Sequence, residues 1–433
     1  MAEISFLGAA REVGRSCILV KGRESVLLDC GVKLGQEEEY PLLDYEAIKA
    51  LDKVVLSHAH LDHSGYLPAL YASGYKGKVF LTKPTRDLIQ LLLADYLRIK
   101  ESTSPYKQEH VAKLLTHTEM LEYHEEKQGI QFYDAGHILG SAITKINTGD
   151  STVLYTGDMN LRASRLLEGA EKGMEADTLI IESTYGAKAD CHPSSKEAGR
   201  ILVEEINDTV KQGGKVLIPT FAIGRGQEIL FTLESYLRSG ALEKTPIYLD
   251  GMVNKVLRIY RHNAIYLKKE VQRRILTSDD DPFKSEHYLV PQKRNRSDVF
   301  EQPNAVILAT SGMLNGGPSV GYLEKLAPEE KNKIIMVGFQ AQGTRGRMLL
   351  EGVKQIQLAD KLIDVNFKVR QAPFSGHSDH KELVEFAKSI KGLKNVFIVH
   401  GEEAKSLELQ TALKKHLKHA KVEVPKLGEK FEV

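Results

Sequence analysis

The chain has 433 residues, which is too long for one ordinary hydrophobic core, so we expect two or three domains. Its 42% hydrophobic and 27% charged residues are typical of a soluble globular protein, and no run of about 18 apolar residues predicts a membrane span. A net charge of +1 excludes a general attraction to acidic partners, so any surface for nucleic acid has to be local. The three cysteines form no CxxC pair and the first residues resemble no signal peptide, which predicts a cytoplasmic protein.

The sequence pattern of the predicted strands and helices changes twice along the chain. Residues 1–185 contain short apolar runs broken by Gly, Asp and His, which predict strands, and residues 87–99 and 111–123 have helical spacing. Residues 186–358 contain longer strand–loop–helix units, which predict a parallel, doubly wound sheet in a separate domain. Residues 359–433 return to the first style and include an amphipathic helix over 402–419. This order predicts a second domain inserted into a first.

Several apolar runs in this chain finish on a histidine or a carboxylate. The residues at these ends are Asp29, His58 with His60, Asp158, Glu182 and His400. Strand ends of one α/β sheet lie along one edge, so we expect these side chains to converge there. His137 follows another apolar run and is expected to join them.

The segment "SHAHLDHSG", residues 57–65, concentrates His58, His60, Asp62 and His63, although the chain has only 15 histidines. Convergent imidazoles and carboxylates without cysteine predict a nitrogen and oxygen metal site, which suits Zn²⁺ and does not exclude Mn²⁺ or Fe²⁺. A single histidine near a turn is more often a satisfied polar residue than a ligand. Coincidence is a poor explanation for this density, so we predict ligands for two metal ions.

The order of "LLDCG", "SHAHLDHSG", "AGHILGSA" and "TGDMN" resembles the metallo-β-lactamase fold. "IIESTYG", "FSGHSDH" and "VHGE" resemble the additional motifs of its β-CASP branch, and "PTFAIGRGQE" and "ATSGMLNGG" resemble the inserted β-CASP domain. The resemblance spans nearly the whole chain and is nearest to archaeal cleavage-and-polyadenylation-specificity-factor-like ribonucleases without KH domains, with RNase J as the neighbouring group. It implies an α/β fold, a metallo-β-lactamase αββα sandwich over 1–185 and 359–433 with the β-CASP domain, a doubly wound parallel sheet, over 186–358.

The resemblance also implies two zinc ions per chain and assigns their ligands. The first ion would be held by His58, His60 and His137, and the second by Asp62, His63 and His400. Asp158 would bridge both ions, Asp62 would also serve catalysis, and Asp29 would orient a ligand histidine from behind. Two such ions would offset the charge of a phosphodiester and lower the pKa of a bound water.

His377 is the expected general acid for the 3′ leaving oxygen, because a histidine can hold a proton near neutral pH. Glu182 would orient His377 and favour its protonated form. A merely structural, histidine-rich turn is the alternative, since His380 lies three residues further along.

Glycine-rich loops follow the predicted strands of the insert, and backbone N–H groups at helix starts bind phosphate well. We therefore predict RNA contacts by residues in three of these loops: Arg225, Ser311, Gly312, Met313 and Arg345. Tight turns of any doubly wound fold explain the glycines equally well. Residues 255–274 carry seven Lys and Arg with Tyr260 and Tyr266 between them, where a solvated helix face is favoured over an RNA track. "SDDDPF" at 278–283 predicts a turn rather than a metal cluster.

These features predict a zinc-dependent ribonuclease that hydrolyses single-stranded RNA in RNA processing, 3′-end maturation or decay. The alternatives are a small-molecule hydrolase of lactamase or thioesterase type, a DNA-directed nuclease of the same family, and a non-catalytic RNA-binding subunit. The insert argues against the first, because it would cover the site, and the intact ligand set argues against the last. Endonucleolytic and 5′-to-3′ exonucleolytic action stay open, since both use the same metals. The alternating end at 421–433 leaves a homodimer open.

Overall fold

The computed structural model describes residues 2–35, 37–100, 103–278 and 280–433, and the chain divides into two compact units. Unit 1 consists of Met1–Ala163, Leu167–Cys191 and His377–Val433. Unit 2 consists of Ser164–Leu166 and His192–Gly376. An inserted domain is therefore present, as the change in sequence style predicts. None of the described helices combines the length and the apolarity that a membrane crossing needs.

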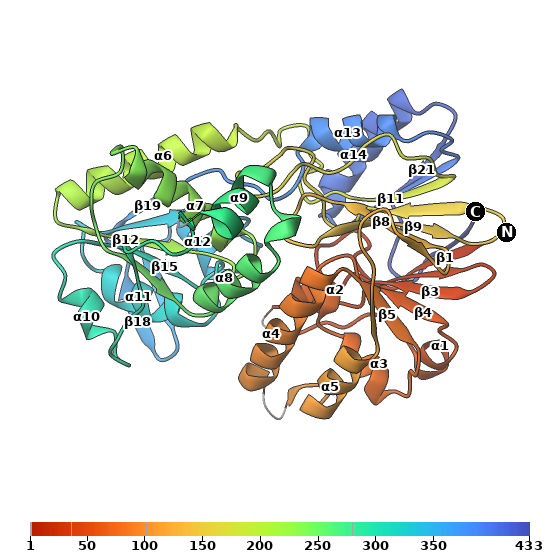
Figure 1. Ribbon diagram of the computed structural model, residues 1–433, viewed down its shortest axis with the longest axis horizontal. Helices are drawn as coiled ribbons and strands as arrows, with labels where there is room; N and C mark the ends of the chain where they lie inside the picture. The colour runs from red at the N-terminus through yellow and green to blue at the C-terminus, as the bar shows by residue number, and fades with distance from the viewer. Residues whose placement is uncertain (1, 36, 101–102, 279) are drawn as a thin grey trace. The chain divides into compact units, whose positions relative to one another are not determined.

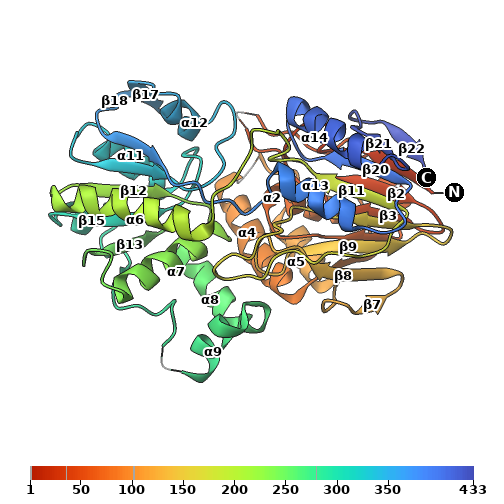
Figure 2. The same ribbon diagram turned by 90° about the horizontal axis from the view of Figure 1, so that it is seen from above.

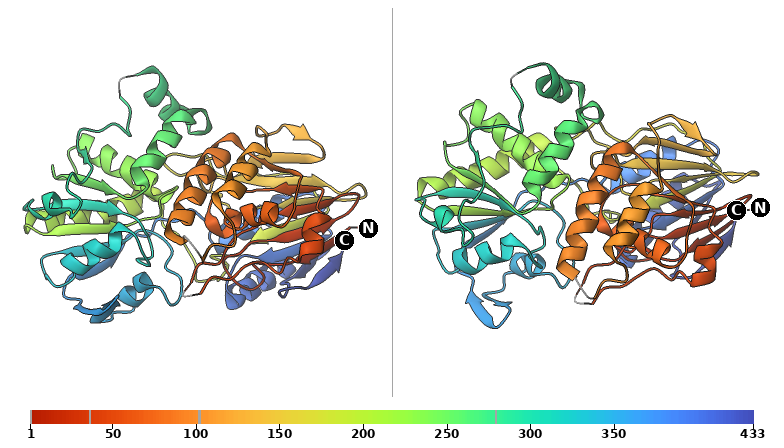
Figure 3. Two further views of the ribbon diagram at one scale, coloured as in Figure 1. Left: turned by 90° about the horizontal axis from the view of Figure 1, so that it is seen from below. Right: turned by 60° about the horizontal axis from the view of Figure 1, so that its bottom comes forward.

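Unit 1 contains two seven-stranded sheets that pack face to face (Figure 1). In spatial order the first sheet holds β22 (Lys430–Glu432), β1 (Glu3–Phe6), β2 (Ile18–Lys21), β3 (Ser25–Leu28), β4 (Lys53–Val55), β5 (Lys78–Leu81) and β6 (Thr118–Met120). The second holds β21 (Lys421–Glu423), β20 (Asn395–Val399), β11 (Thr178–Glu182), β10 (Thr152–Tyr155), β9 (Ala142–Asn147), β8 (Ile130–Asp134) and β7 (Glu126–Lys127). Strands β3 to β6 run parallel, as do β10, β11, β20 and β21. Because β22 pairs with β1, the two ends of the chain lie side by side (Figure 3).

Both faces of the central strands in the second sheet are buried. Ile180 and Phe397 point into the core between the two sheets. Their neighbours Leu179 and Ile398 pack on the other face against Phe386 and other apolar side chains of the C-terminal helices. A strand buried on both faces has no polar side to show, which is why β11 and β20 appear in the sequence as continuous apolar runs.

Helices cover the outer faces of this sandwich (Figure 2). The helices of unit 1 are α1 (Tyr45–Lys49), α2 (Leu61–Ser64), α3 (Leu67–Ala72), α4 (Lys83–Lys100), α5 (Gln108–Thr116), α13 (His380–Ser389) and α14 (Glu403–His416). The structure therefore has the αββα order of layers that the resemblance implies. The prediction of a helix over 111–123 is only half correct: α5 ends at Thr116, and the next residues form β6. These residues form a strand because they pair with β5. A segment of three residues is too short to show the alternation of apolar and polar residues that predicts a strand.

Unit 2 is built on a six-stranded sheet whose strands are all parallel. Its spatial order is β14 (Tyr288–Leu289), β13 (Ile247–Asp250), β15 (Ala305–Ala309), β12 (Lys215–Pro219), β16 (Lys333–Met336) and β19 (Lys368–Gln371). A small antiparallel sheet holds β17 (Gln355–Leu358) and β18 (Lys361–Asp364). The helices of unit 2, which lie on both faces of the parallel sheet (Figure 1), are α6 (Ser195–Lys211), α7 (Arg225–Arg238), α8 (Val253–His262), the 3₁₀ helix η2 (Ala264–Tyr266), α9 (Lys269–Thr277), α10 (Ser297–Phe300), α11 (Pro318–Leu326) and α12 (Arg345–Leu350). This is the expected doubly wound arrangement.

The chain returns to unit 1 later than the sequence pattern indicates. We expected the return after residue 358, whereas unit 2 continues to Gly376. The reason is β19, which is the edge strand of the parallel sheet and pairs with β16. An edge strand of one sheet and a strand of another have similar local sequence patterns, so the pattern alone does not show to which sheet residues 368–371 belong.

Candidate metal centre

The polar strand ends come from both sheets of unit 1, not from one sheet as the sequence argument assumed. In the first sheet, Asp29 follows β3, and His58 with His60 follows β4. In the second sheet, Asp158 follows β10, Glu182 ends β11 and His400 follows β20. Their side chains nevertheless converge, because the carboxyl ends of these strands lie at the same end of the sandwich.

Two glycines allow the loops of the centre to approach one another closely. Gly31, after β3, lies so near α2 that a Cβ atom there would stand 1.7 Å from the carbonyl oxygen of Asp62. Gly157, just before Asp158, has a φ of +53°, and a Cβ atom there would stand 2.6 Å from the Cβ of Ser57. A side chain at either position would force the backbones apart, so the motifs "LLDCG" and "TGDMN" need these glycines.

The first group of ligands, cluster A, contains His58, His60, His137 and Asp158. The Nδ1 atom of His60 lies 3.2 Å from the Nε2 atoms of both His58 and His137. The Oδ2 atom of Asp158 lies 3.6 Å from Nε2 of His58 and 3.7 Å from Nε2 of His137. Zinc bonds of about 2.0–2.2 Å in a tetrahedron place their ligand atoms ~3.4 Å apart, so the spacing suits that ion.

The second group, cluster B, contains Asp62, His63, Asp158 and His400. The other carboxylate oxygen of Asp158, Oδ1, lies 3.4 Å from Nε2 of His63 and 3.1 Å from Nδ1 of His400. Asp62 faces Nε2 of His400 through its Oδ2 atom at 3.3 Å. Asp158 therefore offers one oxygen to each cluster, which is the bridging arrangement that the resemblance implies.

The donor atoms fit bound cations. Among the described residues, three buried atoms of cluster B have no hydrogen-bond partner: Nε2 of His63, Nε2 of His400 and Oδ1 of Asp158. An unsatisfied buried polar atom costs about 1–3 kcal/mol, and a metal ion between these atoms would remove that cost for the ones that face it. The donor set is nitrogen and oxygen without sulfur, which suits Zn²⁺.

The electrostatics of the centre favour positive charge between its carboxylates. Burial lowers the pKa of His58 and of His60, so both stay neutral, as a metal ligand must be. In cluster B, burial also opposes the charged form of His400, but Asp158 and Asp62 outweigh burial and raise the pKa of His400 to about 10. Burial opposes the charged form of Asp158 too, yet His400 and His63 hold its pKa well below the usual range. Positive charge between these carboxylates, supplied by protons or by metal ions, is therefore favourable.

His377 and Glu182 form a hydrogen-bonded pair beside cluster A. The Nδ1 atom of His377 lies 3.0 and 3.1 Å from the two carboxylate oxygens of Glu182, which is fully buried. The ring of His377 lies 4.5 Å from that of His137, measured between centroids. Burial opposes protonation of His377, but Glu182 and Asp158 outweigh burial and raise its pKa. A raised pKa suits a proton donor. A donor atom from each of Asp158, Glu182 and His377 also lies close enough together to hold an ion.

The neighbouring histidine has a different place. His380 is the first residue of α13, and its Nδ1 atom is 2.7 Å from the carbonyl oxygen of Gly186. This contact ties the start of α13 to the loop after β11. His380 is in none of the three groups of potential metal ligands among the described residues.

The candidate RNA contacts in unit 2 make structural interactions. Arg225 is mostly buried, its Nη1 atom lies 2.5 Å from Oε2 of Glu228, and its guanidinium lies 5.7 Å from the ring centroid of Phe374. Arg345 donates to the carbonyl oxygens of Gln357 and Leu314. These contacts hold both arginines in place and leave their contact with RNA as a prediction.

The loop after β15 is equally tight. Gly312 is buried, and a Cβ atom there would lie 2.9 Å from the backbone nitrogen of Phe221. The Oγ atom of Ser311 donates to the carbonyl oxygen of Gly316, and the carbonyl oxygen of Met313 accepts from Gly346 at the start of α12. Close packing therefore explains the glycine in this loop without a ligand.

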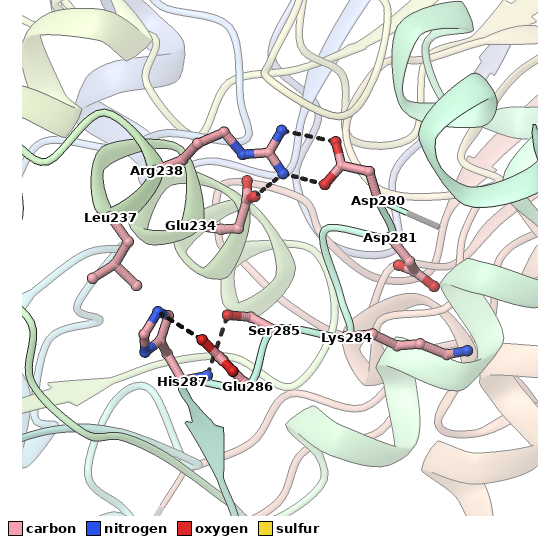
Figure 4. Close-up of a pocket in the computed structure, with 9 residues that line it drawn as sticks. All are labelled: Glu234, Leu237, Arg238, Asp280, Asp281, Lys284, Ser285, Glu286 and His287. Atoms are coloured by element: carbon pink, nitrogen blue, oxygen red, sulfur yellow. Dashed lines mark hydrogen bonds and ion pairs between the residues drawn. The ribbon is translucent and has the colours of Figure 1, made fainter. Parts of the chain in front are cut away.

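The basic stretch over 255–274 belongs mainly to the structure of unit 2. Tyr260 is buried and presents no stacking face, while Arg261 pairs with Asp281. Arg274 lies 2.9 Å from Glu234, which also pairs with Arg238. Figure 4 shows the ion pairs of Arg238 with Glu234 and Asp280 in a pocket lined by Glu234, Leu237, Arg238, Asp280, Asp281, Lys284, Ser285, Glu286 and His287. These contacts hold Arg261 and Arg274 within unit 2, and the preference for a solvated helix face over an RNA track stays a prediction.

The acidic run at 278–283 behaves as a turn where it is described, and Asp279 lies outside the described residues. Within the described ranges, every group of side chains that could hold a metal lies in unit 1.

Sequence reasoning missed two residues of the centre. Ser57 and Tyr155 are buried, and their hydroxyl groups donate to Asp29. The only signal for Ser57 is its position directly before His58 at a strand end. Tyr155 gives no such signal, because an aromatic residue in a strand ordinarily belongs to the core.

Comparison with known proteins identifies the family. The chain matches the Metallo-beta-lactamase superfamily domain over residues 18–184, the Beta-Casp domain over 226–349 and the Zn-dependent metallo-hydrolase RNA specificity domain over 362–425. It is 42% identical over 439 residues to "Transcription termination factor FttA" of Methanocaldococcus jannaschii, covering 96% of this chain and 69% of that protein. It is 40% identical over 428 residues to an "RNase J-like protein" of the same organism, covering 96% and 97% of the two chains.

A solved structure of a protein of unknown function from Enterococcus faecalis V583 has the same fold. Its TM-score is 0.58 at 14% identity, over 99% of each chain. The order of the three matched domains and the extent of the matches to archaeal relatives confirm the resemblance seen in the motifs. The chain belongs to the β-CASP branch of the metallo-β-lactamase family, and this branch consists of metal-dependent nucleases.

Proposed function

We propose that this protein is a zinc-dependent ribonuclease that hydrolyses phosphodiester bonds of single-stranded RNA. The observation that carries the proposal is the pair of four-residue clusters that share Asp158, with the His377–Glu182 pair beside them. The relatives named FttA and RNase J-like, and the match to an RNA specificity domain, support RNA as the substrate.

Each residue of the centre has a separate task in this proposal. His58, His60 and His137 would hold one zinc ion, and Asp62, His63 and His400 the other, with Asp158 holding both. When bound, the ions supply positive charge to the phosphodiester and lower the pKa of a water molecule. Asp62 is one of the less enclosed ligands, with a side chain that is 31% exposed, and so lies where a substrate can meet it.

His377 would deliver a proton to the leaving 3′ oxygen, which gives a 5′-phosphate and a 3′-hydroxyl as products. Its bond to Glu182 fixes the ring and favours the protonated form, because a buried carboxylate attracts the imidazolium. The ring nitrogen that faces away from Glu182, Nε2, is the one that would transfer the proton.

Both modes of cleavage fit this chemistry, in RNA processing, 3′-end maturation or decay. A gel of RNA labelled at its 5′ end distinguishes them, since internal cuts give a ladder of fragments and 5′-to-3′ digestion releases labelled mononucleotide. Matched RNA and DNA oligonucleotides, together with a β-lactam and a thioester, test the alternatives in the same assay. Cleavage of RNA that depends on added zinc supports the proposal. Turnover of DNA or of a small molecule in preference to RNA would overturn it.

A cytoplasmic location and a homodimer belong to the same proposal. The three cysteines form no disulfide, which suits a reducing compartment. The C-terminal strands β21 and β22 each occupy the outer position of a sheet, where a second copy has a free edge to pair with. Light scattering of the purified protein measures the oligomeric state directly.

A further inference from the structure

Asp29 accepts four hydrogen bonds although it is completely buried and belongs to neither cluster. Its Oδ1 atom accepts from the backbone N–H of Ser57 at 2.7 Å. Its Oδ2 atom accepts from the Ser57 hydroxyl at 2.7 Å, from Nδ1 of His63 at 2.6 Å and from the Tyr155 hydroxyl at 2.8 Å. Such a carboxylate is held rigidly and can orient whatever it accepts from.

The hydroxyl of Ser57 connects Asp29 to the other cluster. A hydroxyl has one proton to donate, and here the proton goes to Asp29. The 3.0 Å contact between Oγ of Ser57 and Nδ1 of His58 must then be an N–H of His58 that donates to the serine oxygen. His58 is thereby fixed with its proton on Nδ1 and its bare Nε2 toward cluster A.

His63 is fixed in the same way, but directly. Its Nδ1–H donates to Asp29, so Nε2 is the nitrogen that faces Asp158 in cluster B. We propose that Ser57 is a positioning residue that relays the orientation of Asp29 to His58, so that one carboxylate aligns a histidine in each metal cluster. This proposal rests on the zinc centre of the proposed function and adds to it a route by which both clusters share one support.

Tyr155 donates to the same oxygen of Asp29 as His63 and the Ser57 hydroxyl do. Its hydroxyl lies 2.9 Å from Oγ of Ser16 as well as 2.8 Å from Asp29, so the tyrosine spans from the first sheet to the second. Tyr155 comes from β10, the strand that leads to Asp158. The bridging ligand and the shared support are therefore attached to the same strand.

Removing the Ser57 hydroxyl should affect the clusters unequally. In Ser57→Ala the backbone N–H of residue 57 still donates to Oδ1 of Asp29, and His63 and Tyr155 still donate to Oδ2. Asp29 and His63 therefore keep their geometry, whereas Nδ1 of His58 loses its acceptor. Loss of such a support ordinarily weakens metal binding about 10–100-fold, so cluster A alone should weaken by that factor.

The test is a competition titration of Zn²⁺ against a chromophoric chelator, with ¹¹³Cd²⁺ NMR to separate the two clusters. The resonance lost in His60→Ala identifies cluster A, because His60 belongs to that cluster only. Ser64→Ala is the matched control, since Ser64 is a buried serine whose hydroxyl donates to the carbonyl oxygen of Ala59 and not to a histidine side chain.

We expect Ser57→Ala to weaken zinc binding by cluster A, and Asp29→Asn to weaken zinc binding by both clusters. In the Asp29→Asn background, adding Ser57→Ala should change the zinc affinity of cluster A little, because the carboxylate that orients Ser57 is already absent. Normal binding in Ser57→Ala, or equal weakening of both clusters, would overturn the relay while leaving the zinc centre intact. A wild-type protein that takes up fewer than two ions would instead overturn the proposed function, and the relay with it.

Discussion

Replacement of His377 separates proton delivery from metal binding. His377 is in contact with Glu182 and with the ring of His137, but clusters A and B of potential metal ligands are complete without it. We therefore expect His377→Ala to keep both ions and to bind RNA. Loss of a general acid costs about 10²–10⁴ in rate, which is about 3–5 kcal/mol of transition-state stabilisation.

The structure shows what else this substitution would disturb. Glu182 would stay buried and keep the backbone N–H groups of Met159, at 2.8 Å, and Thr184, at 3.3 Å, but it would lose the imidazole donor of His377. Leaving that carboxylate less satisfied costs about 1–3 kcal/mol of stability. His377→Asn is the better variant, because an amide N–H can replace Nδ1–H toward Glu182 while supplying no acid. Both variants should be slow, and His377→Asn should retain more of the wild-type melting temperature.

The assay compares ordinary RNA with RNA that carries a 3′-bridging sulfur at the cleavage site. Sulfur leaves readily as an anion, so the defect of His377→Asn should shrink on that substrate. His400→Ala supplies the contrast, because it removes a ligand of cluster B and should lose zinc as well as activity. If His377→Asn loses a metal ion, or cleaves the sulfur substrate as poorly as ordinary RNA, His377 is a ligand or a structural residue and the acid assignment is wrong.

Other substitutions test the remaining assignments. Asp158→Ala should lower zinc occupancy in both clusters, measured by metal analysis, since each of its oxygens faces one cluster. Arg225→Ala should weaken RNA binding at low salt, with an effect that shrinks as salt rises if Arg225 touches phosphate; unchanged binding with a lower melting temperature would make its pair with Glu228 purely structural. Burial raises the pKa of Asp134 to about 7, so the folded state keeps a proton that the unfolded state releases near its ordinary pKa, and this residue lowers stability as pH rises from about 4 to 7. Asp134→Asn should therefore stabilise the protein by up to about 4 kcal/mol at pH 8 and by much less at pH 5, in denaturant titrations at the two pH values.

The sequence predicts well which polar side chains converge, because a strand that is buried on both faces must place its first polar residue where it leaves the core. Asp158 and His400 both follow such runs, and the spacing of His58, His60 and His63 adds a second, independent signal. These patterns do not show to which sheet each strand belongs. A strand end shows where a chain emerges, whereas the pairing that places β4 and β10 in different sheets depends on contacts far apart in the sequence.

The predictions are weakest where a residue type has several ordinary uses. Arginine in a glycine-rich loop is expected to face solvent, yet Arg225 is mostly buried because Glu228, one turn along the same helix, neutralises it. Ser57 and Tyr155 carry no distinctive spacing, and their importance comes entirely from the buried carboxylate between them. Hydrogen bonds of this kind are set by tertiary structure and leave no pattern in a single sequence.

The inserted unit 2 separates the residues of the centre along the sequence, and this separation affects how the centre forms. Cluster A is complete within residues 58–158, before the chain enters the main part of unit 2 at His192. Cluster B needs His400, and the acid pair joins Glu182 to His377 across a separation of 195 residues. Closing a flexible loop of that length would cost on the order of 5 kcal/mol in chain entropy, so a compact unit 2 that holds its own ends in place spares much of that cost. Cluster A therefore depends less on the folding of the insert than cluster B and the His377–Glu182 pair do.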